Sequence, residues 1–541
     1  MKTIKKTGEK ISNKFKKIKF MNFKQLTSDQ LLKITNIAQL KASGYEPKGI
    51  KQELRDNLIE KLQKGEEVFP GIWGYEETVI PDMERAILSM HHVNLLGLRG
   101  QAKTRIARMM INLLDEYIPV VKGSELNDDP LQPLSRFAID LITEHGDHTA
   151  VEWFHRSDRY TEKLATPDVS IADLIGDADP IKAATLKLPY SDERVIHFGL
   201  IPRSHRCIFV INELPDLQAR IQVALFNILQ EGDIQIRGFK VRLPLDIQFV
   251  FTANPEDYTN RGSIVTPLKD RIDSQILTHY PKTLEIGKKI TRQEAKVKAG
   301  QGEKIEMHEL LEDLIEQIAI EARSSEYVDS KSGVSARLTI SAYENLLSSA
   351  ERRSLINKEK QTNVRIGDLW GIIPSITGKI ELVYEGEQEG PYIVAQNLVG
   401  KAIRTMFLKY FPDPEKLKKN KKEKTLSPYQ NITNWFGDGN VLDVMNNASN
   451  KDYRESLMKV NGLRDLVNTY HDGSPDPKKL LLMEFALHGL AEYSQISKGN
   501  LTSGLQFKDL LSSMFSGSSS FTDDDDEDYN DEDKNSPKRK F

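Results

Sequence analysis

A candidate phosphate-binding segment lies between positions 97 and 104. Gly97 and Gly100 are followed by Lys103 and Thr104, which nearly completes the pattern G-x-x-x-x-G-K-[ST]. Glycines let backbone N–H groups approach an anion, a lysine ammonium reaches the terminal phosphates of a nucleotide, and a threonine hydroxyl binds Mg²⁺. Ala102 stands where the pattern has its last glycine. Alanine adds only a methyl group, and we expect a negative φ at this position because a helix starts here.

The segments on either side of this loop are those that a phosphate site requires. Residues 93–96 form a mostly apolar run, and apolar residues at helical spacing follow the loop from Ile106 to Leu114. A glycine turn beside a chance Lys-Thr pair is the alternative, but it does not account for the flanking strand and helix. We therefore predict a strand, a phosphate loop and a helix that bind ATP with Mg²⁺. The candidate binding residues are Gly97, Arg99, Gly100, Gln101, Ala102, Lys103, Thr104 and Arg105.

A second group of chemically competent residues ends a buried strand. After Cys207, four apolar residues lead directly to Asn212 and Glu213. Such a run predicts a buried parallel strand that delivers both side chains at its carboxyl end. The first would place Mg²⁺ and the second would activate the attacking water. Asn212 offers a carbonyl oxygen to the metal but lacks the full negative charge of an aspartate.

A third polar residue follows another apolar run. Residues 247–253 predict a buried strand, and Asn254 at its end could hold the water beside the terminal phosphate. Asn-Pro alone would only indicate a turn. Between the two strands we expect a helix at residues 217–229 and a β-hairpin at residues 232–243, around Arg237 and Gly238.

Together these segments resemble the AAA+ ATPases of the magnesium-chelatase and MoxR branch, over residues 66–385. Residues 97–104 look like their Walker A segment, residues 208–213 like Walker B, and Asn254 like sensor 1. The expected hairpin is similar to the one that precedes sensor 1 in this branch. Two further segments look like the chain on either side of the insert that this branch carries in the second helix of its ATPase core. They are residues 174–180 and 198–206.

The resemblance also points to two arginines. Arg271, in residues 268–273, is similar to an arginine finger that acts on a neighbouring subunit, and Arg337 is similar to sensor 2 at the start of a lid helix. A surface ion pair with Asp270 or Asp273 is the alternative for Arg271. The resemblance thus implies the catalytic residues Glu213, Asn254, Arg271 and Arg337 and the metal ligands Thr104 and Asn212.

The family resemblance implies an ATPase that works on a partner as a homo-oligomeric ring, a hexamer. The partner would be a protein with a von Willebrand A domain or a chelatase subunit. Two alternatives stay open: the motor subunit of a true Mg or Co tetrapyrrole chelatase, and an ATP-binding scaffold that hydrolyses little because of Asn212.

Composition sets the wider limits. The chain has 541 residues and a formal net charge of −4, so its overall charge does not indicate a specific nucleic-acid partner. Its single cysteine, Cys207, excludes an intramolecular disulfide and suits the cytoplasm. No apolar run approaches the length of a transmembrane segment.

The predicted fold class is α/β: a P-loop AAA+ αβα core with a parallel sheet, then an α-helical lid and a further mostly helical region. Within the lid we expect helices at residues 310–322, 340–353 and 364–376, the last broken at Pro374. Residues 416–424, rich in lysine, predict an exposed loop. The predicted domains are a basic extension with helices (1–65), the ATPase core (66–285), the lid (286–385), a helical region of unknown role (386–515) and an acidic disordered tail (516–541).

Overall fold

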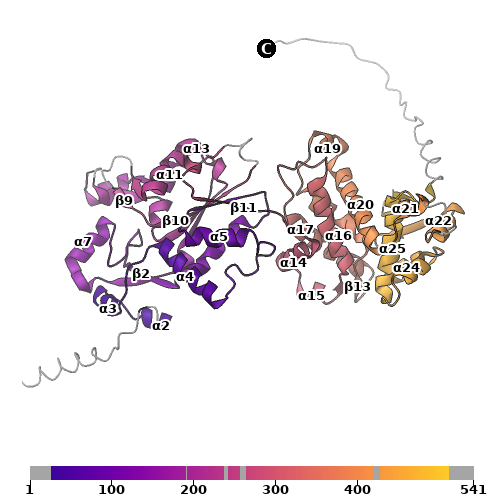
Figure 1. Cartoon of the computed structure of the whole chain (residues 1–541), viewed down its shortest axis with the longest axis horizontal. Helices are drawn as coiled ribbons and strands as arrows, with labels where there is room; N and C mark the ends of the chain where they lie inside the picture. Colours follow the sequence, from indigo (N-terminus) through magenta and orange to yellow (C-terminus); the bar gives the residue numbers. More distant parts are fainter. Residues whose placement is uncertain are drawn as a thin grey trace, which may run out of the picture. The chain divides into compact units, whose positions relative to one another are not determined.

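The structure is a computed structural model, and two compact units make up its chain (Figure 1). The first unit extends to Gln293 and also includes Val328–Arg337 and Lys379–Glu381; the second consists of Glu294–Tyr327, Leu338–Gly378 and the chain from Leu382 onward. The residues described are 23, 26–189, 192–236, 242–255, 263–419, 427–501 and 503–510.

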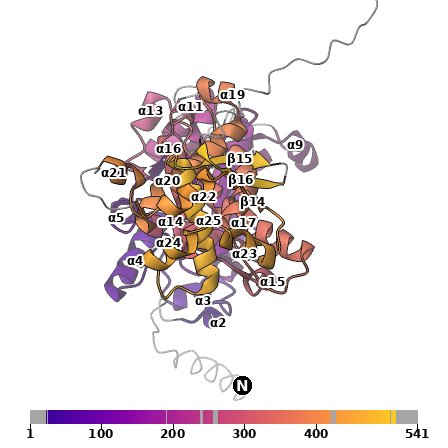
Figure 2. The ribbon, with the colours of Figure 1, turned by 90° about the vertical axis from the view of Figure 1, so that its right-hand side faces the viewer.

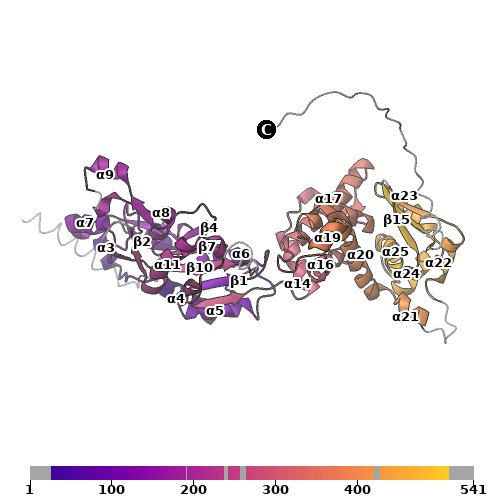
Figure 3. The same ribbon diagram turned by 90° about the horizontal axis from the view of Figure 1, so that it is seen from above.

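A five-stranded parallel sheet organises the first unit. Its order is β11-β1-β10-β7-β4, and Figure 3 shows β4, β7, β10 and β1 side by side. Because all the strands are parallel, their carboxyl ends lie at one edge of the sheet, where ligands of open α/β folds bind. The sheet confirms the predicted α/β class. Its strands are β1 (Val93–Leu96), β4 (Tyr160–Leu164), β7 (Cys207–Asn212), β10 (Ile247–Ala253) and β11 (Ser274–Leu277).

Both faces of the sheet are covered, which explains why its central strands read as continuous apolar runs. Along β7, Ile208 and Val210 belong to the core formed with α4 (Ile50–Lys64), α5 (Val79–Leu88) and α6 (Lys103–Met109). Phe209 and Ile211 belong to the opposite core, formed with α11 (Ala219–Glu231). Successive residues of a strand alternate between the faces, so each strand contributes to both cores.

Smaller elements complete the first unit. Strand β2 pairs with β3. The expected hairpin is β8 paired with β9, and Arg237 and Gly238 lie outside the described residues. These elements are α2 (Ser28–Leu31), α3 (Ile37–Ala42), η2 (Met110–Leu113), β2 (Tyr117–Val121), α7 (Arg136–His145), η3 (Gly146–His148), β3 (Val151–His155), η4 (Arg156–Asp158), α8 (Ile171–Leu174), β5 (Gly176–Ala178), α9 (Pro180–Leu186), η5 (Glu193–Val195), β6 (Ile196–Phe198), α10 (Leu200–Arg203), η6 (Leu214–Asp216), β8 (Asp233–Gln235), β9 (Arg242–Pro244), α13 (Thr266–Lys269) and α14 (Leu284–Glu294).

The second unit is mainly helical but contains a sheet that the sequence reasoning missed. Strands β14 (Leu442–Met445), β16 (Gly504–Lys508) and β15 (Ser497–Leu501) form a three-stranded antiparallel sheet (Figure 2). Its other elements are α15 (Ala299–Gly302), β12 (Ile305–Glu306), α16 (Glu309–Ser324), α17 (Arg337–Ile356, whose first residue belongs to the first unit), β13 (Thr362–Asn363), η7 (Ile366–Ile372), α18 (Ile373–Thr377), α19 (Tyr384–Glu389), α20 (Pro391–Tyr410), α21 (Pro414–Lys419), α22 (Gln430–Gly437), α23 (Asn450–Met458), α24 (Leu463–Tyr470) and α25 (Asp476–Glu492).

Two expectations for the second unit differ from the structure, and a third concerns residues outside those described. Pro374 does not break a helix: a 3₁₀ segment ends at Ile372, and Pro374 lies in the first turn of α18, where its missing N–H costs nothing. The lysine-rich segment starts as helix α21 rather than as a loop, and residues 420–424 lie outside the described residues. The predicted tail at 516–541 also lies outside them.

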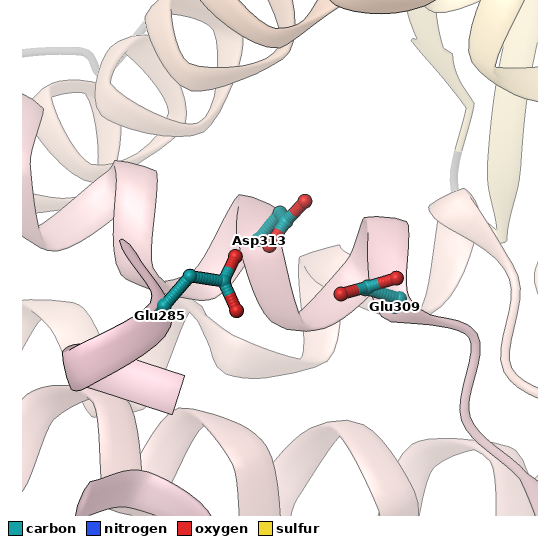
Figure 4. Close-up of side chains that lie close together, drawn as sticks. All are labelled: Glu285, Glu309 and Asp313. Carbon is teal, nitrogen blue, oxygen red and sulfur yellow. The ribbon is translucent and has the colours of Figure 1, made fainter. Parts of the chain in front are cut away.

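Acidic side chains near the start of α16 have an ordinary structural explanation. Glu309 and Asp313 lie one turn apart on this helix (Figure 4). Negative charge near a helix N-terminus is stabilised by the helix dipole. We assign no metal site to them. Among the helices of the described residues, none is long and apolar enough to cross a membrane.

Candidate nucleotide-binding site

The loop after β1 is packed so tightly that two of its positions accept only glycine. A Cβ atom on Gly97 would lie 2.0 Å from the Thr278 hydroxyl oxygen, and one on Gly100 would lie 2.2 Å from the Ser335 hydroxyl oxygen. Gly100 also has a φ of +74°, which disfavours any side chain. The Gly97 N–H donates to the carbonyl of Ala253, which fixes the start of the loop against β10.

The backbone at Ala102 contradicts our expectation. Its φ is +57° and its ψ is 14°, in the left-handed region, and not the negative φ that we predicted. The reason is that Ala102 is the residue before the helix: α6 begins at Lys103, so Ala102 still belongs to the loop. A glycine at this position of the pattern would adopt the same conformation without strain.

Tyr75, which no motif in the sequence marks, contacts the loop from the segment before α5. Its hydroxyl lies 3.0 Å from the Gln101 carbonyl oxygen and 2.7 Å from that of His279. The Gln101 side chain in turn accepts a hydrogen bond from the Thr278 hydroxyl at 2.7 Å. Burial raises the pKa of Tyr75 to about 12, so its hydroxyl stays protonated and can donate. The conformation of the loop is therefore fixed by the residues directly after β11 and by the segment before α5.

The Lys103 side chain turns back over the loop. Its ammonium donates to the carbonyl oxygens of Gly97 and, at 3.0 Å, Leu98, and to the Asn254 side-chain oxygen at 2.6 Å. The side chain is buried. A buried ammonium needs such acceptors, and a phosphate would supply stronger ones in the same place.

Asn254 joins Lys103 to Glu213. Its amide nitrogen donates to a Glu213 carboxylate oxygen at 2.8 Å, while its oxygen accepts from Lys103. A carboxylate can only accept and an ammonium can only donate, so the orientation of this amide is unambiguous. Glu213 has a left-handed backbone, with φ of 55°, and its N–H donates to the Thr252 hydroxyl at 3.2 Å. Three residues predicted from three separate segments thus lie together at the carboxyl edge of the sheet.

Asn212 faces Thr104, as a shared metal site would require. The Thr104 hydroxyl lies 3.4 Å from the Asn212 side-chain oxygen, which also accepts from the Thr252 hydroxyl at 3.0 Å. Mg²⁺ prefers oxygen ligands and is usually held by few protein groups together with phosphates and water. The donor set of Thr104 and Asn212 therefore fits a magnesium ion bound beside nucleotide phosphates.

Glu162 is a second residue that sequence reasoning missed. It lies on β4, the edge strand beside β7, and one carboxylate oxygen accepts from the Asn212 amide nitrogen at 2.6 Å. The other carboxylate oxygen lies 2.9 Å from both Nε and Nη2 of Arg108 and 3.2 Å from the Tyr160 hydroxyl. The sequence does not indicate β4, because its three consecutive polar residues, Thr161 to Lys163, resemble an exposed segment.

The two loop arginines have different surroundings. Arg99 forms an ion pair with Glu381 and donates to the Ser332 carbonyl at 3.3 Å. Hydrogen bonds from Ser332 and Arg99 lower the pKa of Glu381. Arg105 is half-buried in the first turn of α6. Arg99 therefore ties the loop to the chain segments at 328–337 and 379–381.

The two arginines assigned by resemblance lie in separate places. Arg271 donates to the Gln230 side chain at 3.0 Å and to the Pro267 carbonyl at 2.7 Å, and its guanidinium lies 5.0 Å from the centre of the Phe226 ring. These contacts differ from the surface ion pair considered as the alternative. Arg337 is exposed and begins α17, directly after the segment that packs on Gly100.

Comparison with known proteins gave structural matches but no family model. A protein provisionally named an ATPase, from Cytophaga hutchinsonii ATCC 33406, is 16% identical over 67% of this chain and 97% of its own, with a TM-score of 0.27. NtrX from Brucella abortus is 13% identical over 60% of this chain and 59% of its own, with a TM-score of 0.28. A cryo-electron microscopy complex of subunits BchI and BchD of magnesium chelatase gives 19% identity, coverage of 59% and 98%, and a TM-score of 0.30.

Proposed function

We propose that the chain is an AAA+ ATPase of the magnesium-chelatase and MoxR type, which couples ATP hydrolysis to work on a partner protein. The observation that carries this proposal is the connection of Lys103, Asn254 and Glu213 beside a glycine loop at the carboxyl edge of a parallel sheet. A phosphate-binding ammonium, a water-orienting amide and a general base are the groups that phosphoryl transfer to water needs.

Each side chain would have a separate task in hydrolysis. Lys103 places a positive charge against the terminal phosphates, replacing its carbonyl partners with phosphate oxygens. Thr104 and Asn212 offer oxygens to Mg²⁺, which when bound neutralises phosphate charge during transfer. Glu213 accepts a proton from the attacking water, and the Asn254 amide holds the Glu213 carboxylate in place for this step.

We further propose that the active form is a homo-oligomeric ring, a hexamer, in which Arg271 acts on the nucleotide of a neighbouring subunit. Arg337 would contact the nucleotide from the start of α17. The partner would be a von Willebrand A domain protein or a chelatase subunit. Charge compensation by an arginine from a second subunit strongly accelerates phosphoryl transfer, so turnover would depend on assembly.

The test is a comparison of nucleotide binding and turnover in Glu213→Gln. This variant should bind ATP like the parent but lose turnover by on the order of 10²-fold or more, because glutamine cannot accept the proton. Glu231→Gln, at the exposed end of α11, is the matched control and should behave like the parent. Turnover in Glu213→Gln at the parent's rate would disprove the catalytic assignment. Tight binding without turnover in assembled parent rings would instead favour the scaffold alternative.

A further inference from the structure

The side chain of Asn212, whose oxygen faces Thr104, contacts a carboxylate through its amide nitrogen. Glu162 accepts a hydrogen bond from the Asn212 amide nitrogen at 2.6 Å. In the parallel register, Leu164 of β4 lies opposite Asn212, and Glu162 is on the same face of β4 two residues earlier. A long side chain reaches such a diagonal neighbour, so the contact follows from the strand pairing.

This contact decides which atom of Asn212 faces Thr104. A carboxylate has only acceptor oxygens here, so the Asn212 group turned toward Glu162 must be its NH₂. The amide oxygen is then directed to the other side, where it accepts from Thr252 and lies 3.4 Å from the Thr104 hydroxyl. Without Glu162, either orientation of the amide could form a hydrogen bond with the two threonine hydroxyls, since hydroxyls both donate and accept.

We propose that Glu162 is a positioning residue that compensates for the missing charge of Asn212. It fixes the amide with its oxygen toward the metal-binding position and polarises that oxygen through a charge-assisted hydrogen bond. Glu162 and Asn212 together thus replace one aspartate: the asparagine supplies the ligand atom and the glutamate supplies the negative charge. This inference rests on the proposed ATPase function and adds a determinant of its magnesium affinity.

Arg108 carries a charge opposite to that of Glu162 and contacts it. One carboxylate oxygen of Glu162 accepts hydrogen bonds from Arg108 and Tyr160, and the other accepts a hydrogen bond from Asn212. The Arg108 side chain is 61% exposed and that of Glu162 is 23% exposed. Water strongly screens the attraction between Arg108 and Glu162, because the Arg108 side chain is largely exposed. Arg108 therefore offsets only part of the negative charge that acts on the Asn212 amide. If Glu162 served only to bind Arg108, removal of either partner would have the same effect.

The experiment measures the Mg²⁺ concentration that half-saturates binding of a fluorescent ATP analogue, and the affinity of that analogue in excess EDTA. In the full chain, Glu162→Gln should raise the Mg²⁺ midpoint about tenfold, because it exchanges a charged acceptor for a neutral one. The affinity in EDTA should stay unchanged, because Lys103 and the loop are intact. Absence of binding by the parent both in Mg²⁺ and in EDTA would refute the ATP-binding function itself and not this inference.

Two further variants separate charge from structure. Glu162→Gln combined with Asn212→Asp again contains one carboxylate and one amide, and its Mg²⁺ midpoint should return to within about threefold of the parent. Arg108→Gln removes the ion pair but keeps the Glu162–Asn212 contact, so its midpoint should not rise. An unchanged midpoint in Glu162→Gln, no rescue by the exchange, or an equal rise in Arg108→Gln would overturn the proposal. If Glu162→Gln does not fold, Glu162→Asp replaces it in the experiment. Aspartate keeps the charge but moves it away from the Asn212 amide, so the Mg²⁺ midpoint should rise by a smaller factor. An unchanged midpoint in Glu162→Asp would also overturn the proposal.

Discussion

At Ala102 the phosphate loop carries a residue type that its backbone does not favour. The left-handed conformation at φ of +57° brings the Cβ atom close to the following carbonyl oxygen. Such strain persists where the surroundings fix the backbone, and here Gln101 is held by Thr278 and Tyr75. These contacts hold Ala102 in a backbone conformation that glycine would adopt without strain.

We expect Ala102→Gly to stabilise the first unit by up to about 1 kcal/mol. It removes a strain of about 1–2 kcal/mol, and the greater freedom of glycine in the unfolded chain offsets part of this gain. Ala184→Gly, at an exposed position within α9, is the matched control and should destabilise by about 1 kcal/mol. Thermal unfolding midpoints of the two variants should therefore move in opposite directions. A lower midpoint in Ala102→Gly would show that the left-handed backbone is not strained.

The sequence predicted the residues at the strand ends better than those around them. Lys103, Asn212, Glu213 and Asn254 follow from glycine spacing and from polar residues after apolar runs, because parallel strands end at one edge. The backbone conformation at Ala102 could not be predicted, since it depends on where the helix begins. Tyr75, Thr252 and Glu162 act through side-chain contacts with other segments, and no local pattern marks such contacts.

A buried ion pair joins helix α4 to the edge of the sheet. Both nitrogens at the end of the Arg159 guanidinium donate to the Glu53 carboxylate at 2.7 Å, and both side chains are almost fully buried. Arg159 directly precedes β4 and also donates to the Arg206 carbonyl. This arrangement fixes the start of the strand that carries Glu162.

Breaking this pair should be costly because it leaves one charge buried without its partner. We expect Glu53→Gln to lower the free energy of unfolding by about 3–5 kcal/mol. Glu60→Gln, which removes the exposed ion pair with Lys64 on the same helix, should change it by less than about 0.5 kcal/mol. Denaturant unfolding followed by tryptophan fluorescence measures both. Equal effects of the two substitutions would contradict the assigned role of the buried pair.

Elements with strong periodicity were predicted, and short or unusual elements were not. The expected helices at residues 310–322 and 340–353 correspond to α16 and α17 because their apolar residues recur at helical spacing. The sheet of β14, β15 and β16 was missed, since its strands have four or five residues and little distinguishes them from loops. Pro374, expected to break a helix, lies instead in the first turn of α18, a position that accepts proline.

In an assembled ring, the proposed action of Arg271 between subunits predicts complementation. Arg271→Ala and Glu213→Gln should each lose turnover as pure rings. In mixed rings, some interfaces would combine an intact Glu213 with a neighbour's intact Arg271, so turnover should partly return.

A mixture of Lys103→Ala and Glu213→Gln subunits is the matched control for this experiment. Both substitutions disable the nucleotide site of their own subunit, so no interface in these rings is complete. Native mass spectrometry would establish that mixed rings form. Failure of Arg271→Ala to complement Glu213→Gln in such rings would exclude a finger that acts in trans.

The proposed function has one requirement: the loop from Gly97 to Thr104 must bind the phosphates of ATP. Its most direct test is the affinity of a fluorescent ATP analogue for Lys103→Ala, compared with Lys122→Ala, which changes an exposed lysine after β2. We expect Lys103→Ala to bind the analogue about 100-fold more weakly or worse, because a buried, hydrogen-bonded charge partner is removed. Lys122→Ala should bind like the parent, and both variants should keep the parent's circular dichroism spectrum. Parent-like affinity in a folded Lys103→Ala would contradict the assignment of the loop.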